Sequence, residues 1–248
     1  ILRANSLKTS TKHLIEELKH ENVESFQVPG FENAVQLEEK KNVFLTSAFK
    51  DGFFEVQDAG SQKIGEFLDV KPGMRVVDAC AGAGGKTLHL AALMENKGQI
   101  IAMDIHGWKL AELKRRAKRA GAHNIETREI TDNKVIKRLH EKADRLLIDA
   151  PCSGLGVLKR NPDSKWKIDQ DFIDRIRKEQ ETILQDYSKI IKKGGKMVYA
   201  TCSILPSENN EQVENFLKNN PDFKLVKEEK VMPSTGFDGF YMALIERV

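Results

Sequence analysis

Two cysteines in this sequence stand where a thiol could act as a nucleophile. Cys152 lies in the run Asp149-Ala-Pro-Cys-Ser-Gly and Cys202 in Thr-Cys-Ser, and each run follows a short apolar stretch typical of a buried strand. A free cysteine is more often an inert buried side chain than a reactive group. Two cysteines at the carboxyl ends of parallel strands, however, would share the rim of a sheet at which doubly wound folds bind ligands. Their placement therefore favours covalent chemistry.

A glycine-rich run lies between an apolar strand and an expected helix. It reads Asp78-Ala-Cys-Ala-Gly-Ala-Gly-Gly-Lys-Thr, and its glycines fall at the turn, where backbone can approach a ligand closely. The spacing excludes a P-loop, which would need glycine at Cys80, and a GxGxxG turn, which would need glycine at Thr87. Asp104 ends the next strand, where a carboxylate can accept from both ribose hydroxyls. These features suit S-adenosylmethionine, and a tight packing turn without a ligand is the alternative.

Apolar stretches of strand length, separated by helical segments, indicate an α/β fold with a doubly wound parallel sheet. The expected strands are residues 75–78, 99–104, 145–149 and 196–201, with two closing strands over 224–231 and 240–246. The longest helix is expected from about residue 169 to residue 192, ended by Gly194 and Gly195.

The first fifty residues follow a different pattern. A strand near residues 1–5, a helix near residues 10–20 and short extended stretches indicate a small α+β domain. We therefore expect two domains, residues 1–50 and residues 51–248. Because Ile1 already lies inside an apparent strand, we also expect that an N-terminal portion of the protein is absent from this numbering.

Composition places the chain among ordinary globular proteins. Of its 248 residues 40% are hydrophobic and 31% charged, and no apolar run approaches the roughly 18 residues that span a bilayer. Three widely separated cysteines without a secretory signal favour a reducing compartment. We expect a soluble, cytoplasmic protein without a membrane anchor, and a monomer.

The net charge of +3 is too small to establish nucleic-acid binding, but the basic residues cluster. Five of them share one expected helix, where a solvated helix face is the more ordinary interpretation: Lys114, Arg115, Arg116, Lys118 and Arg119. A second cluster follows Cys152 in a segment expected to be a loop, and it consists of Lys159, Arg160, Lys165 and Lys167. For this cluster a surface that contacts phosphates, with Lys159 and Arg160 as the RNA-binding residues, and an ordinary loop stay equally open.

Taken together, the runs Asp78–Thr87, Asp149–Gly154 and Ala200–Ser203 resemble the RsmB/NOP family of RNA cytosine-5 methyltransferases. The likeness extends over nearly the whole chain, to Gln57-Asp58, Ser61-Gln62, Asn161-Pro-Asp-Ser-Lys-Trp and Asp238-Gly-Phe-Tyr. The run Gly156-Val-Leu-Lys-Arg-Asn-Pro-Asp is similar to the bacterial branch that acts on small-subunit ribosomal RNA. The chain departs from the family at Gly82-Ala83, where Ala-Pro is usual.

The resemblance implies a Rossmann-like methyltransferase sheet after a small RNA-binding domain similar to an RRM, with S-adenosylmethionine as cofactor, RNA as partner and no metal. The implied cofactor residues are Cys80, Ala81, Gly82, Ala83, Gly84, Gly85, Lys86, Asp104, Asp132 and Asp149. Asp104 would contact the ribose, Asp132 the adenine side, and Asp149 would lie between the cofactor and the cytosine. For Lys86, a charged contact near the substrate and a surface lysine stay open.

The resemblance also gives the two cysteines separate roles. Carbon 5 of cytosine is a poor nucleophile, and a thiolate that adds to carbon 6 makes carbon 5 enamine-like. Cys202 is the implied thiolate, Cys152 assists product release, and Asp149 hydrogen-bonds the ring edge. A DNA-type enzyme would use Cys152 as the nucleophile instead. A tRNA substrate, or a catalytically silent RNA-binding or assembly factor, are further alternatives.

Overall fold

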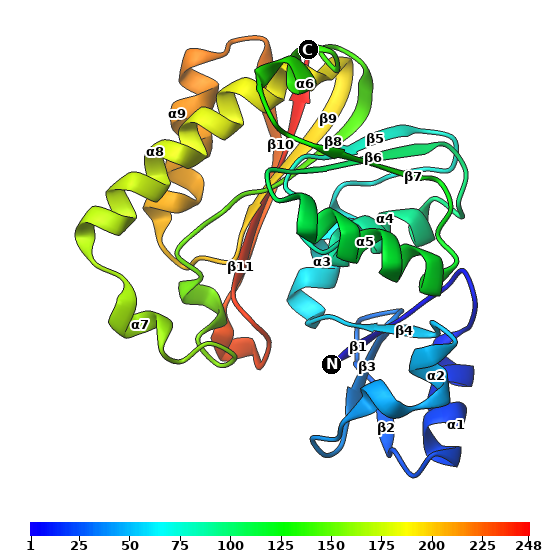
Figure 1. Cartoon of the computed structure of the whole chain (residues 1–248). Coiled ribbons are helices and arrows are strands. Elements are labelled where there is room, and N and C mark those ends of the chain that lie inside the picture. The colour runs from blue at the N-terminus through cyan, green and yellow to red at the C-terminus, as the bar shows by residue number, and fades with distance from the viewer.

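A seven-stranded sheet runs through the larger part of the chain in the computed structural model, which describes residues 1–248 (Figure 1). Its strands, in sheet order, are β10 (Phe223–Val231), β11 (Phe240–Arg247), β9 (Ile191–Thr201), β8 (Ala143–Asp149), β5 (Arg75–Asp78), β6 (Gln99–Asp104) and β7 (Ile125–Glu129). Strands β5 to β9 run parallel, and β10 and β11 are antiparallel at one edge. The expected α/β fold with a parallel-dominated sheet is confirmed.

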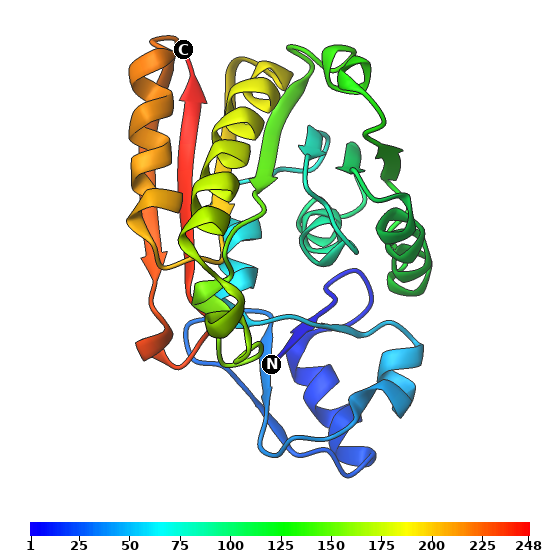
Figure 2. The same cartoon turned by 60° about the vertical axis from the view of Figure 1, so that its left-hand side comes forward.

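Helices cover both faces of this sheet (Figures 1 and 2). One face carries α3 (Ala59–Phe67), α4 (Gly85–Leu93) and α5 (Gly107–Ala120), and the other α6 (Asn133–Lys137), α8 (Gln170–Tyr187) and α9 (Asn210–Asn219). On β5, Val76 packs into the core beneath the first set and Val77 into the core beneath the second. Burial on both faces explains why the parallel strands are continuous apolar runs.

The end of the longest helix differs from the sequence prediction. Helix α8 ends at Tyr187, a 3₁₀ turn follows over Ser188–Ile190, and β9 already begins at Ile191. The prediction of a helix to residue 192 was wrong, and Gly194 and Gly195 lie within the strand. Ile190 and Ile191 are completely buried in the core of the sheet, and such packing overrides a local helical pattern.

The N-terminal part is a separate four-stranded antiparallel sheet in the order β2-β3-β1-β4. Its elements are β1 (Leu2–Ala4), α1 (Thr11–His20), β2 (Ser25–Gln27), β3 (Ala34–Leu37), α2 (Ser47–Lys50) and β4 (Phe54–Val56). This β-α-β-β-α-β order is that of the split βαβ topology. Because β4 pairs with β1, this sheet extends beyond residue 50. The division into two domains stays a prediction.

The two faces of the small sheet have different neighbours. Leu2 and Phe54 pack with the α1 side chains in a small apolar core. On the opposite face Arg3 is only 2% exposed, and Glu55 forms ion pairs with Arg116 and Arg119 of α5. The small sheet therefore packs against the large domain with a charged and buried face. None of the helices combines the length and apolar character needed to cross a bilayer.

Candidate active site

A cavity of about 460 Å³ opens at the carboxyl ends of the parallel strands. Most of the residues predicted to form the site line it, namely Cys80, Ala81, Gly82, Ala83, Gly85, Lys86, Asp149, Cys152, Arg160 and Cys202. Gln57 and Asp58, which join the small sheet to α3, and Ser61 in the first turn of α3 line one side of the cavity. The structure thus brings the glycine-rich turn and both cysteines into one space.

The turn between β5 and α4 shows why its glycines are needed. Gly84 has a φ of +91°, and a Cβ at this position would lie 2.5 Å from Leu113 Cγ. Gly82 has a φ of +54°, but a Cβ at Gly82 or at Gly85 would meet no atom within 4 Å. Gly84 therefore serves close packing on α5, whereas Gly82 and Gly85 leave open space beside the cavity for a ligand to approach the backbone.

Asp104 holds this turn in place through a hydrogen bond to its backbone. Its Oδ2 accepts from the backbone N–H of Gly82 at 2.9 Å, and its Oδ1 accepts from that of His106 at 2.8 Å. The side chain is nearly buried and is not among the residues that line the cavity. Asp132 caps α6, accepting from the backbone N–H of Lys134 at 2.7 Å, and also lies outside the lining. The assignments of ribose and adenine contacts to these two residues stay predictions.

Lys86 and Asp149 form an ion pair in the cavity, with 2.6 Å between Nζ and Oδ2. Burial would lower the pKa of Lys86, but the charge and hydrogen bond of Asp149 outweigh it and raise the pKa. Lys86 is therefore a charged group that lines the cavity, and its contact with a substrate stays a prediction. Only 15% of its side chain is exposed, so it is not a surface lysine.

Asp78 is a second carboxylate at the cavity, and the sequence pattern gave it no role beyond its place in the glycine-rich run. Its Oδ2 accepts from Thr87 Oγ1 at 2.7 Å, whereas the buried Oδ1 has no hydrogen-bond partner. Burial raises the pKa of Asp78 to about 7, with the negative charge of Asp149 adding to the rise and the Thr87 hydrogen bond opposing it. The unused acceptor could have been found only from the three-dimensional packing.

The two cysteines lie side by side. Strands β8 and β9 are neighbours, and the Sγ atoms of Cys152 and Cys202 are 3.3 Å apart. The hydrogen bond with Cys152 lowers the pKa of Cys202, and the charges of Lys86 and Arg160 lower it further. Burial and the negative charge of Asp149 oppose this shift. The same hydrogen bond, together with burial, raises the pKa of Cys152. The directions of the two pKa shifts therefore favour Cys202 over Cys152 as the thiolate.

Lys159 and Arg160 lie at the mouth of the cavity. Arg160 lines it and forms an ion pair with Asp238, with Nε and Oδ2 2.6 Å apart, while 59% of the arginine side chain stays exposed. Lys159 is exposed in an adjoining pocket that also includes Lys40 and Lys41. Both predicted basic residues are therefore accessible beside the cysteine site.

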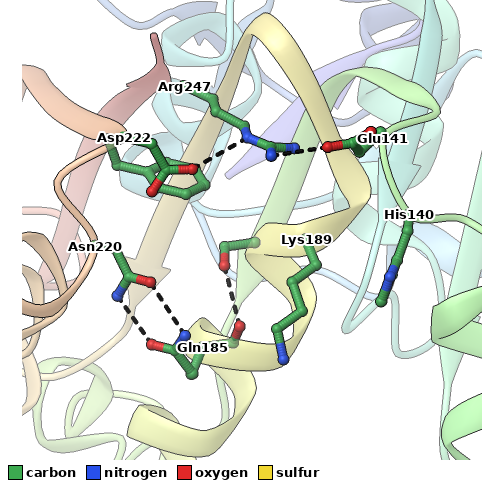
Figure 3. Close-up of a pocket in the computed structure, with 9 residues that line it drawn as sticks. His140, Glu141, Gln185, Lys189, Asn220, Asp222 and Arg247 are labelled. Carbon is green, nitrogen blue, oxygen red and sulfur yellow. Dashed lines mark hydrogen bonds and ion pairs between the residues drawn. The ribbon is translucent and has the colours of Figure 1, made fainter.

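A second pocket, of about 350 Å³, lies at the opposite ends of the parallel strands (Figure 3). Arg247 projects between Glu141 and Asp222 and pairs with both. Gln185 and Asn220 exchange two hydrogen bonds between their amide groups. The pocket contains no thiol, and these polar groups already bond one another.

The doubly wound sheet, the glycine turn and the cysteine pair together define the class of Rossmann-like methyltransferases. A family model described as 16S rRNA methyltransferase RsmB/F matches residues 66–245, most of the chain. The chain belongs to this RsmB/F methyltransferase family. This is a family of S-adenosylmethionine-dependent methyltransferases.

Two curated relatives illustrate the likeness. The probable ribosomal RNA small subunit methyltransferase B of Synechocystis is 37% identical over 90% of this chain and 50% of its own length. The ribosomal RNA small subunit methyltransferase B of Proteus mirabilis is 34% identical over 99% of this chain and 58% of its own length. The chain therefore spans only about half of the length of such relatives.

A solved structure agrees with the fold. The methyltransferase homologue protein from Pyrococcus horikoshii has a TM-score of 0.87 and 28% identity, covering 100% of this chain and 86% of that chain. Because the match covers the whole of this chain, it includes the small N-terminal sheet as well as the large sheet.

Proposed function

We propose that this chain transfers a methyl group from S-adenosylmethionine to carbon 5 of a cytosine in RNA through a covalent bond from Cys202. The observation that carries the proposal is the pair of thiols 3.3 Å apart in the cavity that also contains the Lys86–Asp149 ion pair. A single thiol would suffice for addition alone. A second thiol in contact with the first suits a reaction that must also release its covalent product.

The residues beside the glycine turn fit the proposed cofactor. Gly82 and Gly85 leave space for a ligand against the backbone, and the free Oδ1 of Asp78 is a buried acceptor suited to a positively charged amino group. Asp104 holds the backbone of Gly82 in place. When bound there, S-adenosylmethionine supplies the methyl group.

The cysteines and the ion pair supply the remaining chemistry. The Cys202 thiolate forms a bond to carbon 6 of the cytosine, and the displaced electron pair raises the electron density at carbon 5. The Asp149 carboxylate, oriented by Lys86, accepts a hydrogen bond from the exocyclic amine at the edge of the ring beside nitrogen 3. After methylation the proton on carbon 5 passes to a base, the role in which Cys152 assists release. The electron pair of that C–H bond re-forms the double bond between carbons 5 and 6, and Cys202 leaves carbon 6 as a thiolate.

The alternative nucleophile is Cys152, as in a DNA-type enzyme. The directions of the two pKa shifts favour Cys202, because the Sγ–Sγ hydrogen bond lowers the pKa of Cys202 and raises that of Cys152, even though the backbone N–H of Cys202 donates to Cys152 Sγ at 3.3 Å. Lys86 and Arg160 add positive charge near Cys202.

The substrate is proposed to be small-subunit ribosomal RNA, since the curated relatives carry that name. A cytosine must leave its stack to reach the cavity, which favours a loop or a locally opened helix. The charged face of the small sheet packs against α5, so that face is closed to stacked bases. RNA is proposed to enter instead past Lys159 and Arg160.

The test is a map of 5-methylcytosine in total RNA from cells with the gene, without it, and with the gene restored as the wild type or as Cys202→Ala. One cytosine of the small-subunit RNA should lose its methyl group without the gene and regain it only with the wild type. A site lost from tRNA would instead favour the tRNA alternative. Identical maps in all four strains would contradict the proposed activity and favour a silent binding factor.

A further inference from the structure

Glu208 is a fully buried carboxylate that none of the steps above uses. It ends the 3₁₀ turn Pro206–Glu208, directly before α9, and its relative exposure is 0%. Its carboxylate contacts four hydrogen-bond donors, all of them neutral. A charge buried without a counter-ion is costly unless hydrogen bonds replace its lost water. The position of Glu208 therefore depends on the loops that supply those bonds, and the positions of those loops depend on Glu208.

The donors come from the two loops that carry the cysteines. Oε1 accepts from Ser153 Oγ at 2.5 Å and from Ser203 Oγ at 2.6 Å. Oε2 accepts from the backbone N–H of Ser153 at 2.8 Å. Ser153 directly follows Cys152, and Ser203 directly follows Cys202. One carboxylate therefore bonds the residue next to each thiol.

Neighbouring side chains extend these bonds to the other flank of each cysteine. Gln180 Nε2 donates to Glu208 Oε2 and also to the carbonyl of Pro151, both at 2.9 Å. Asn209 accepts from Thr201 Oγ1 at 2.5 Å and donates to the carbonyl of Ser203 at 3.0 Å. The residues on both sides of each thiol are thus held by Glu208, by Asn209 beside it, and by Gln180 of α8.

We propose that Glu208 is a positioning residue that keeps Cys152 and Cys202 in contact through its hydrogen bonds to Ser153 and Ser203. The inference rests on the proposed function, in which the two thiols act on one cytosine. The contact depends on two loops 50 residues apart, and a shift of either loop by about 1 Å would lengthen the Sγ–Sγ distance beyond hydrogen-bonding range. Without that contact Cys202 loses the donor that stabilises its thiolate.

Glutamine at this position should preserve the geometry. Its amide oxygen can accept from the Ser153 backbone and Gln180, and its amide N–H₂ can donate to the two serine hydroxyl oxygens, which then turn their protons elsewhere. Alanine removes all four bonds. Glu208→Gln should therefore retain the contact between the two thiols, and Glu208→Ala should lose it. Comparing these two variants shows whether Glu208 acts through its hydrogen bonds or through its charge.

The experiment measures the pH dependence of Cys202 alkylation by iodoacetamide in the full chain, with the modified cysteine identified by mass spectrometry. The groups that face Cys202 are Cys152, Asp149, Lys86 and Arg160, and no variant changes them. Glu208→Ala should shift the alkylation midpoint upward by about one pH unit, with a rate about tenfold lower below the midpoint. Glu208→Gln should stay near the wild type. Glu211→Ala, an exposed glutamate on the adjacent α9, is the matched control and should not shift it.

Smaller variants keep the test decisive if Glu208→Ala does not fold. Ser153→Ala and Ser203→Ala each remove part of the bonding and should each produce a smaller shift in the same direction. A midpoint unchanged in folded Glu208→Ala, or in both serine variants, would overturn the proposal. The assay needs neither RNA nor cofactor, so its result is independent of whether the chain methylates cytosine.

Discussion

The two ends of the parallel strands carry pockets of comparable size but different chemistry. At the carboxyl ends, two thiols are in contact and Asp78 has a buried oxygen without a hydrogen-bond partner. The charged pair Lys86–Asp149 faces the same space. The carboxyl ends therefore carry nucleophiles and a hydrogen-bond acceptor that the fold itself does not need.

At the opposite ends the polar groups bond one another. Arg247 pairs with Glu141 and Asp222 and donates to the carbonyl of Ile191, and the Gln185 and Asn220 amides bond reciprocally (Figure 3). The bonds of Arg247 join the last strand to β9 and to the segments before β8 and β10, and those of Gln185 join α8 to the segment before β10. Such bonds stabilise the fold. The difference teaches that a pocket marks a functional site when its polar groups lack partners inside the protein.

The largest effect is expected from the cysteines. Cys202→Ala should lower turnover by roughly a thousandfold or more and form no covalent complex, because the group that adds to carbon 6 is gone. Cys152→Ala leaves addition possible but impairs release, so enzyme joined to methylated RNA should accumulate. The measurement is a denaturing gel after incubation with RNA and cofactor.

The controls for the cysteine experiment come from both ends of the sheet. The double variant Cys152→Ala, Cys202→Ala should lose the covalent band, and Arg247→Ala at the opposite end should lower stability while leaving turnover intact. If Cys202→Ala traps RNA and Cys152→Ala does not, the nucleophile is Cys152. If no variant traps RNA, the silent binding factor gains support.

The unpaired acceptor at the carboxyl ends should appear in the pH dependence of stability. The pKa of Asp78 is about 7 in the folded protein against an ordinary value of 3.8, so between these values only the folded state holds the proton. Stability should therefore fall as pH rises through this window, by up to about 1.4 kcal/mol per pH unit, and level off above it. Asp78→Asn cannot ionise and should lack this fall.

Urea unfolding from about pH 4 to pH 8 measures the effect as the difference between wild type and Asp78→Asn, which removes the contributions of other groups. Thr87→Val removes the hydrogen bond that opposes the rise of the Asp78 pKa, and should extend the falling region to higher pH. If the free energy of unfolding changes with pH in the same way in the wild type and in Asp78→Asn, the pKa of Asp78 is not raised by folding.

Asp104 should have a smaller effect, on cofactor binding. Asp104→Ala leaves the Gly82 backbone N–H without its acceptor and removes the predicted ribose contacts, and we expect affinity for S-adenosylmethionine to weaken by roughly 1 to 3 kcal/mol. Calorimetric titration measures it. Asp186→Ala, at a residue that pairs with Lys189 at the opposite ends of the strands, provides the control and should leave the affinity unchanged. Unchanged affinity in Asp104→Ala would remove Asp104 from the site.

The sequence predicted the parts of this molecule in which local pattern and burial agree. The boundaries of β5 and β6 coincide with the expected residues. A short apolar run that is buried on both faces is typical of a central parallel strand, so its ends can be located from the sequence. Strand β7 was not expected, because it lies at the sheet edge and carries Glu126 and Arg128. The end of α8 was misplaced because Ile190 and Ile191 belong to the core of the sheet.

The candidate site shows the same limit. The motifs identified the residues that line the cavity, since motif residues cluster at strand ends. The bonds of Glu208 to Ser153 join positions 55 residues apart, and the missing partner of Asp78 Oδ1 is a property of the packing around it. Neither is encoded in local spacing, and both required the three-dimensional structure.

The smallest effect is expected on RNA binding, when basic residues at one end of the sheet are changed and compared with basic residues at the other end. Lys159 and Arg160 lie beside the cysteine cavity, whereas Lys189 and Lys192 lie at the opposite ends and pair with Asp186 and Asp144. The double variant Lys159→Ala, Arg160→Ala and the double variant Lys189→Ala, Lys192→Ala each remove two positive charges. Only the first change should weaken RNA binding and flatten the dependence of log K on log salt, by about 1.4 for two lost phosphate contacts to single-stranded RNA. Filter binding over a series of salt concentrations measures both slopes. Equal slopes in the two variants would mean that RNA responds to net charge alone, and that the rim with the cysteines is not where its backbone binds.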